Sequence, residues 1–207
     1  MASQTDPQTP MIKTFEPSRS AVVLIEFQNQ WTDSGLYHRL IRQQLASRSV
    51  LDRTRAFLTE ARSRGSHIIH APLVIDPHNK RGLLANISFG RIFTQGSQGA
   101  EITQGLYQSG DLVVEGRYAF DAFLGSNLEE LLRIHETRTL FMGGFITDQC
   151  IAKTLRTALR KGFDAYLTAD CTATYSGMVQ RRTERRFQTR VLTSEDVLAH
   201  LNEPAFA

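Results

Sequence analysis

The stretch that decides the fold is Leu140-Phe-Met-Gly-Gly-Phe-Ile-Thr-Asp-Gln-Cys150, continued by Ile151-Ala-Lys-Thr-Leu-Arg-Thr-Ala-Leu-Arg-Lys161 and Gly162. It is typical of a buried strand, a glycine-containing turn and a helix with Cys150 in its first turn. A thiol there meets unpaired backbone N–H groups and the positive end of the helix dipole, and both favour the reactive thiolate. Cys150 is therefore a candidate nucleophile, although a lone helical cysteine is often only a small apolar core residue.

Short apolar runs and helical segments alternate on both sides of this stretch. The expected strands cover residues 21–25, 67–71, 111–115, 139–142, 164–168 and 190–192, and the expected helices cover 40–64, 128–134, 148–161, 176–187 and 194–201. Gly65 ends the first helix, and Ser126 with Glu129 forms a capping box at the start of the second. The alternation predicts an α/β fold, a three-layer sandwich whose mainly parallel sheet carries helices on both faces.

The length of 207 residues fits a single domain. Residues 1–15 are polar and contain proline, so we expect a loose N-terminal arm before one domain over residues 16–207. The apolar residues in 72–110 follow neither a helical nor a strand periodicity over any length. Long segments of this kind usually cover a site.

Composition excludes several classes of protein. Hydrophobic residues make up 41% and charged residues 22%, which is ordinary for a soluble domain, and two cysteines give no disulfide framework. No apolar run approaches the roughly 18 residues of a membrane span and no signal-peptide core is visible, so we expect a cytoplasmic protein without a membrane partner. The basic cluster at 181–186 contains a glutamate and no reader motif, which favours a solvated helix face or a subunit contact over nucleic-acid binding.

Three polar side chains follow three of the expected strands. Glu26 comes after the first, Arg117 after the third and Cys150 after the fourth. Because the carboxyl ends of parallel strands meet at one edge of a sheet, these groups should converge there. A carboxylate, a cation and a thiol together suit nucleophilic acyl transfer, with the carboxylate taking the thiol proton and returning it to the leaving group.

At this point the sequence resembles the isochorismatase-like cysteine hydrolases, the superfamily that includes nicotinamidases and N-carbamoylsarcosine amidases. The resemblance runs from about residue 20 to 201. It rests on Val23-Leu-Ile-Glu-Phe-Gln-Asn29, Gly143-Gly-Phe-Ile-Thr-Asp-Gln-Cys150, Thr154-Leu-Arg-Thr-Ala158 with Gly162, and Leu167-Thr-Ala-Asp-Cys-Thr-Ala173. It implies a six-stranded sheet, no cofactor and a homo-oligomer.

The resemblance implies an Asp–Lys–Cys triad, and this chain departs from it twice. Glu26 stands where the aspartate is expected and Arg117 where the lysine is expected, with no lysine between Lys80 and Lys153. A guanidinium holds charge in place but does not shuttle protons. On charge alone, Arg117→Lys should retain or increase hydrolysis.

The resemblance also implies a non-proline cis peptide between Phe145 and Ile146. That bond would turn the Ile146 N–H toward the Cys150 N–H, and the two would form an oxyanion hole.

Substrate-pocket candidates flank the triad positions. They are Phe27, Gln28, Trp31, Tyr118 and Phe145. Aromatic residues commonly line small-molecule pockets, and core packing is the alternative for each of them.

The remaining His and Cys residues favour structural roles. Asp76-Pro-His78 is similar to the Asp-x-His with which nicotinamidases begin their metal site, but the next histidine is His135 on a helix, so we expect a polar loop turn and no metal. Cys171 should be a packed structural thiol. His67 and His70, in one strand, should be satisfied by hydrogen bonds.

Three functions follow from these residues. The first is a cofactor-free hydrolase that cleaves an amide or carbamoyl C–N bond of a small molecule through a Cys150 thioester. The alternative is an isochorismatase-type vinyl-ether hydrolase that releases pyruvate, a reaction that needs the acid but not the thiol. The second alternative is a catalytically degenerate family member that binds a ligand without turnover.

Overall fold

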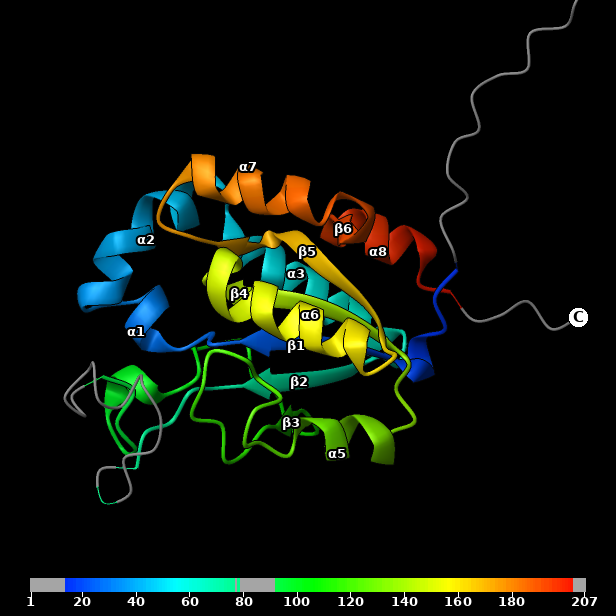
Figure 1. Cartoon of the computed structure of the whole chain (residues 1–207), viewed down its shortest axis with the longest axis horizontal. Coiled ribbons are helices and arrows are strands. Elements are labelled where there is room, and N and C mark those ends of the chain that lie inside the picture. The colour runs from blue at the N-terminus through cyan, green and yellow to red at the C-terminus, as the bar shows by residue number, and fades with distance from the viewer. Residues whose placement is uncertain (1–13, 77, 79–91, 203–207) are drawn as a thin grey trace, which may run out of the picture.

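A six-stranded, fully parallel sheet forms the centre of the molecule, in a computed structural model that describes residues 14–76, 78 and 92–202 (Figure 1). The strand order is β3-β2-β1-β4-β5-β6. The strands are β1 Ser20–Ile25, β2 His67–Ala71, β3 Leu112–Val113, β4 Thr139–Phe145, β5 Asp164–Ala173 and β6 Val191–Leu192. The predicted α/β architecture is confirmed, and the sheet is parallel at every pairing.

Helices cover both faces of the sheet, as Figure 1 shows with α6 in front of the strands and α3 behind them. The helices are α1 Asn29–Thr32, α2 Leu36–Ser47, α3 Val50–Ser63, α5 Leu128–Ile134, α6 Ala152–Arg160, α7 Gly177–Arg186 and α8 Ser194–His200. Buried side chains of α3 and α8 join one hydrophobic core, and those of α5 and α6 join the other. The sheet is therefore the middle of three layers, as predicted.

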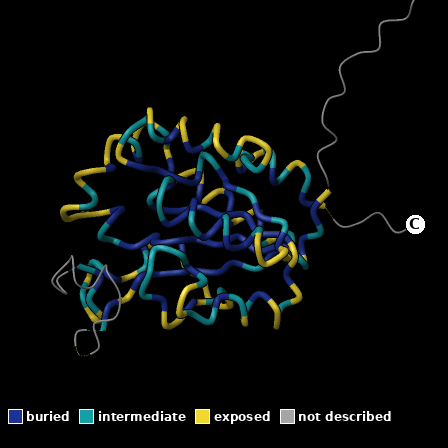
Figure 2. The backbone as a smooth tube through the Cα atoms, viewed as in Figure 1, coloured by how far each residue is buried: buried dark blue, intermediate teal, exposed yellow. Residues whose placement is uncertain are grey.

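The central strands are buried on both faces because each supplies apolar side chains to both cores. In β1, Val22 and Leu24 join the first core while Val23 and Ile25 join the second. Figure 2 shows these strands buried through the middle of the molecule, with exposed residues on the surrounding helices and loops. This two-sided burial explains the uninterrupted apolar runs that mark the strands in the sequence.

Gly144 allows β4 to approach β1 closely. It has φ +129°, and a Cβ atom at this position would lie 1.8 Å from the Ile25 carbonyl oxygen. No other residue fits such a contact, so this glycine fixes where β4 ends and where the Cys150 turn begins.

Two predicted helix features are wrong. The single helix over 40–64 is two helices, because the chain turns at Ser49, whose φ is +50°. The capping box of Ser126 and Glu129 does not form: Asn127 is the N-cap and its side-chain oxygen accepts from the Glu115 N–H instead. A capping box is present on α8, where Thr193 and Asp196 exchange hydrogen bonds.

The expected boundaries also need correction at three places. The helix expected from residue 148 begins as a π-helical turn over Thr147–Ile151, and α6 follows it. The fifth strand continues to Ala173. Phe15, assigned to the loose arm, is buried and packs edge-on against Phe141, because its backbone pairs with the chain at Leu201. The rest of the arm, residues 1–13, lies outside the described residues.

Candidate active site

The structure brings Glu26 and Arg117 together at the carboxyl ends of the strands. Arg117 Nη2 lies 2.5 Å from Glu26 Oε1, and both side chains are almost fully buried. Glu26 directly follows β1 with φ +59°, a conformation that a non-glycine residue rarely adopts and that is concentrated at functional sites. The carboxylate is thus held by one charged partner away from water.

Backbone carbonyls fix the rest of the Arg117 guanidinium. Nη1 donates to the Ala71 oxygen at 2.7 Å, Nε to the Ala119 oxygen at 3.1 Å and Nη2 also to the Phe120 oxygen at 3.2 Å. The same Ala71 oxygen accepts from the Glu26 backbone N–H. These hydrogen bonds connect the end of β2 to the segment after β3. A guanidinium has five N–H donors and an ammonium only three, so arginine can make more of these bonds than lysine.

Cys150 faces the same carboxylate. Its thiol hydrogen-bonds Glu26, and the charges of Glu26 and Arg117 both act on it. Burial first, and then the negative charge of Glu26, raise the pKa of the Cys150 thiol well above its usual value, while Arg117 and a backbone hydrogen bond at Ile146 lower it less. The expectation that the helix start favours the thiolate is therefore wrong, because burial and the charge of Glu26 disfavour the charged form of the thiol. The resting group is a thiol in contact with a base.

The Phe145–Ile146 peptide bond is cis, as expected. The Ile146 backbone group hydrogen-bonds the Cys150 sulfur, so it faces the region where a carbonyl attacked by that sulfur would lie. This placement is compatible with the predicted oxyanion hole of Ile146 and Cys150.

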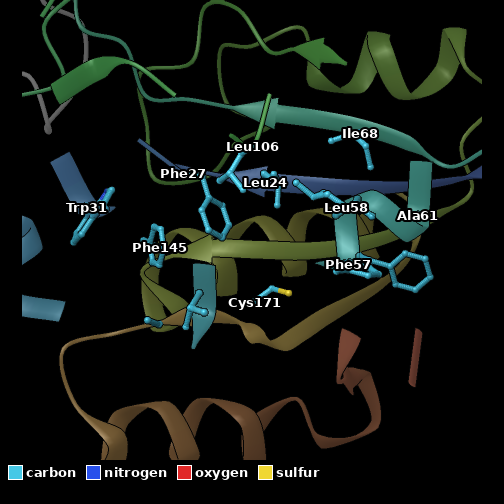
Figure 3. Close-up of a cluster of buried hydrophobic side chains, with 14 of the residues drawn as sticks. Leu24, Phe27, Trp31, Phe57, Leu58, Ala61, Ile68, Leu106, Phe145 and Cys171 are labelled. Carbon is cyan, nitrogen blue, oxygen red and sulfur yellow. The ribbon is translucent and has the colours of Figure 1, made fainter. Parts of the chain in front are cut away.

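Three predicted pocket residues gather near Glu26. Phe27, Trp31 and Phe145 lie at one end of the sheet in Figure 3, with Phe57, Ala61 and Ile68 toward the other end. The Phe27 and Phe145 rings are 4.7 Å apart. The Trp31 indole N–H donates to Glu26 Oε2 at 3.0 Å, so this side chain also orients the carboxylate.

The other two predicted pocket residues have structural partners. The Gln28 amide nitrogen donates to the Leu73 and Ala100 carbonyl oxygens, and its oxygen accepts from the Leu73 N–H. It thereby connects the chain around Leu73 and around Ala100 to the end of β1. Tyr118 packs its ring against Gly125, where an added Cβ would lie 2.1 Å from a ring carbon. Both residues have structural contacts, and their place in a substrate pocket stays a prediction.

Sequence reasoning missed Tyr37 and Phe93. Tyr37 stacks on Trp31 with ring centroids 4.6 Å apart, and Phe93 lies 5.8 Å from Tyr37. Burial, followed by the charges of Glu26 and Cys150, raises the pKa of the Tyr37 hydroxyl, which places this hydroxyl within electrostatic range of the site. The i, i+4 spacing of Tyr37, Ile41 and Leu45 was the available signal, because these residues form the inward face of α2.

The hydrogen bonds expected of the histidines are found in part, because His70 Nδ1 is buried without a partner among the described residues. The Asp76 side chain accepts from the His78 backbone N–H, which makes a turn, while His135 pairs with His67 at a ring distance of 4.7 Å. His70 Nε2 lies 3.0 Å from Asp111 Oδ2. Among the described residues, no group of three His, Cys, Asp or Glu side chains is placed to hold a metal ion.

Cys171 and the basic cluster also match expectation. Cys171 is buried in the first core, and burial raises the pKa of its thiol. Arg181, Arg182, Arg185 and Arg186 are exposed on α7. Within the described ranges, no helix is both long and apolar enough to span a bilayer.

Comparison with known proteins identifies the domain. The family model described as the isochorismatase domain matches residues 20–196. The uncharacterized isochorismatase family protein YrdC of Bacillus subtilis is 39% identical over 62 residues, which cover 30% of this chain and 33% of that protein. The ureidoacrylate amidohydrolase RutB of Rhizobium rhizogenes is 24% identical over 82% of this chain and 76% of its own length. The YrdC match thus spans about a third of that relative.

Solved structures share the fold at low identity. A cysteine hydrolase from Pseudomonas syringae pv. phaseolicola has a TM-score of 0.80 and 17% identity, covering 93% of this chain and 98% of its own. The N-carbamoylsarcosine amidase of Thermoplasma acidophilum has a TM-score of 0.71 and 22% identity, covering 86% of this chain and 97% of its own. Both likenesses show the fold alone.

Proposed function

From the premise that this chain belongs to the isochorismatase family and is a hydrolase, we propose that it cleaves an amide or carbamoyl C–N bond of a small molecule through a Cys150 thioester. The observation that carries the proposal is the contact between the Cys150 thiol and the Glu26 carboxylate, which Arg117 and Trp31 hold from its two oxygens. A relative named as a ureidoacrylate amidohydrolase supports the C–N bond as target.

The proposed reaction begins with a neutral thiol. Glu26 takes the Cys150 proton as the sulfur attacks the carbonyl carbon, so the buried thiolate need not exist before the substrate arrives. The N–H groups of Ile146 and Cys150 would stabilise the oxyanion. The C–N bond then breaks and the leaving nitrogen takes the proton from Glu26.

Water completes the cycle. It loses a proton to Glu26 and attacks the thioester, the carbon–sulfur bond breaks, and the proton returns to the Cys150 sulfur. Arg117 neutralises Glu26 whenever that carboxylate is ionised, and donates no proton of its own.

The test is a substrate panel assayed with wild type, Cys150→Ala and Cys171→Ala. The panel contains ureidoacrylate, N-carbamoylsarcosine, nicotinamide and isochorismate. We expect hydrolysis of at least one C–N substrate, loss of that activity in Cys150→Ala, and retention in Cys171→Ala. Rapid quenching followed by mass spectrometry should detect the acyl group on Cys150.

Two results would replace the proposal. Cleavage of isochorismate that survives Cys150→Ala would indicate vinyl-ether hydrolysis, since that reaction does not need the thiol. Binding of panel compounds without turnover by wild type would indicate a binding protein.

We also propose a homo-oligomer as the working assembly. Leu36 and Leu40 on α2 and Met178 on α7 are large apolar side chains left exposed in the single chain, which supports self-association. Sedimentation at micromolar concentration tests this. A species of only 23.3 kDa would contradict it.

A further inference from the structure

The polar side chains around Cys150 are nearly all committed to partners within the protein. The Arg117 guanidinium donates four of the five hydrogen bonds of which it is capable. One goes to Glu26 and three go to backbone carbonyl oxygens. The only N–H of the Trp31 side chain goes to Glu26. Gln28 has partners for both its amide nitrogen and its oxygen. These groups build the site but have little left with which to bind a substrate.

The Tyr37 hydroxyl differs from them. Within the described parts of the chain it has no hydrogen-bond partner, although it lies within electrostatic range of Glu26 and Cys150. Its ring is fixed between Trp31 and Phe93, nearly parallel to both, with interplanar angles of 21° and 17°. A half-buried polar group held rigidly beside a catalytic centre is placed to pair with a ligand.

The direction of such a bond follows from the surroundings. Tyr37 is protonated at neutral pH, as tyrosine ordinarily is, and burial followed by the charge of Glu26 raises the pKa of its hydroxyl further. The hydroxyl is therefore available as a donor, and its partner on the ligand must be an acceptor.

We propose that Tyr37 is a specificity-determining residue that donates a hydrogen bond to an acceptor oxygen of the substrate outside the scissile amide. The substrate class is thereby narrowed to amides or carbamoyl compounds that carry a second oxygen function, such as a carboxylate. The inference rests on the proposed function, since it assigns the substrate of the same site.

A matched pair of ligands isolates this hydrogen bond. N-carbamoylsarcosine and 1,1-dimethylurea share the carbamoyl group and differ in that the carboxymethyl group of the first is a methyl group in the second. Their dissociation constants would be measured by NMR titration of Cys150→Ala, which cannot turn them over, with and without Tyr37→Phe. Tyr107→Phe serves as the control, because Tyr107 lies half-exposed beside His70.

We expect Tyr37→Phe to weaken binding of N-carbamoylsarcosine about tenfold and that of 1,1-dimethylurea less than about twofold, with no change for Tyr107→Phe. Equal weakening of both ligands would overturn the inference, because it would show that the ring and not the hydroxyl matters. Absence of binding by N-carbamoylsarcosine when Tyr37 is intact would overturn it as well.

Measuring hydrolysis by the wild type, beside the binding experiment, shows whether the role of Tyr37 or the proposed function fails. Hydrolysis that depends on Cys150, combined with binding that Tyr37→Phe leaves unchanged, would leave the function standing and reject the role of the hydroxyl. A ligand-selective loss of binding without any wild-type hydrolysis would support the hydroxyl and reject the hydrolase.

Discussion

The indole N–H of Trp31 donates a hydrogen bond to Oε2 of Glu26 at 3.0 Å, on the carboxylate oxygen that Arg117 leaves open. Each oxygen of the proposed base therefore has its own donor, one neutral and one a cation. Glu has one more methylene than Asp and therefore one more side-chain torsion to restrain. The hydrogen bond from Trp31 restrains this longer side chain so that its carboxylate stays beside Cys150.

Trp31→Phe should lower kcat about tenfold and leave KM nearly unchanged. The variant keeps an aromatic ring for Tyr37 to stack on but removes the N–H that orients Glu26, and a loosely held base transfers protons less effectively. Steady-state kinetics on the substrate found in the panel would measure both constants. An unchanged kcat would mean that Arg117 alone positions the carboxylate.

Glu26→Gln should reduce kcat by about 10²–10⁴-fold and yet make the thiol easier to ionise. Glu26 raises the pKa of Cys150 through its charge and hydrogen bond, while Arg117 lowers it. Removing the negative charge therefore moves the pKa of Cys150 downward, and the pH midpoint of its alkylation moves to lower pH.

Iodoacetamide labelling as a function of pH measures that midpoint, in a Cys171→Ala background so that one thiol reacts. A midpoint that rises or stays fixed in Glu26→Gln would contradict the electrostatic account, even if turnover is lost.

Arg117→Lys should retain hydrolysis but lower the free energy of unfolding by about 1–3 kcal/mol. Lysine keeps the charge beside Glu26, but its ammonium cannot reach all three carbonyls that the guanidinium binds, so buried oxygens lose their partners. Arg117→Ala should lose most activity, since Glu26 would remain buried without its cation. Urea unfolding and turnover of both variants provide the measurements, and equal stability of wild type and Arg117→Lys would contradict the carbonyl argument.

Gly144→Ala should prevent folding or cost at least about 4 kcal/mol, because the new Cβ would overlap the Ile25 carbonyl. Gly162→Ala is the matched control: Gly162 also has positive φ, +86°, but nothing lies within 4 Å of its added Cβ, so its cost should be about 1 kcal/mol. Comparable losses in the two variants would mean that backbone strain, and not the contact with β1, makes Gly144 necessary.

The sequence by itself determined the layered fold and the convergence of three candidate catalytic side chains. The apolar runs of β1 and β4 are long and regular because those strands are buried on both faces, and this pattern is local enough to read without coordinates. Since parallel strands end at one edge, the order of elements sufficed to predict that Glu26, Arg117 and Cys150 meet.

Only the tertiary structure decided the protonation state of the Cys150 thiol beside Glu26. Local sequence predicts a helix dipole that favours the Cys150 thiolate, but burial and the charge of Glu26 depend on groups distant in the chain, and these reverse the direction of the pKa shift. The roles of Gln28 and Tyr37 were hidden for the same reason. Gln28 takes partners from the 72–110 segment and Tyr37 stacks on Phe93. Helical spacing marks Tyr37 as inward-facing, but it does not encode contacts with residues so distant in the sequence.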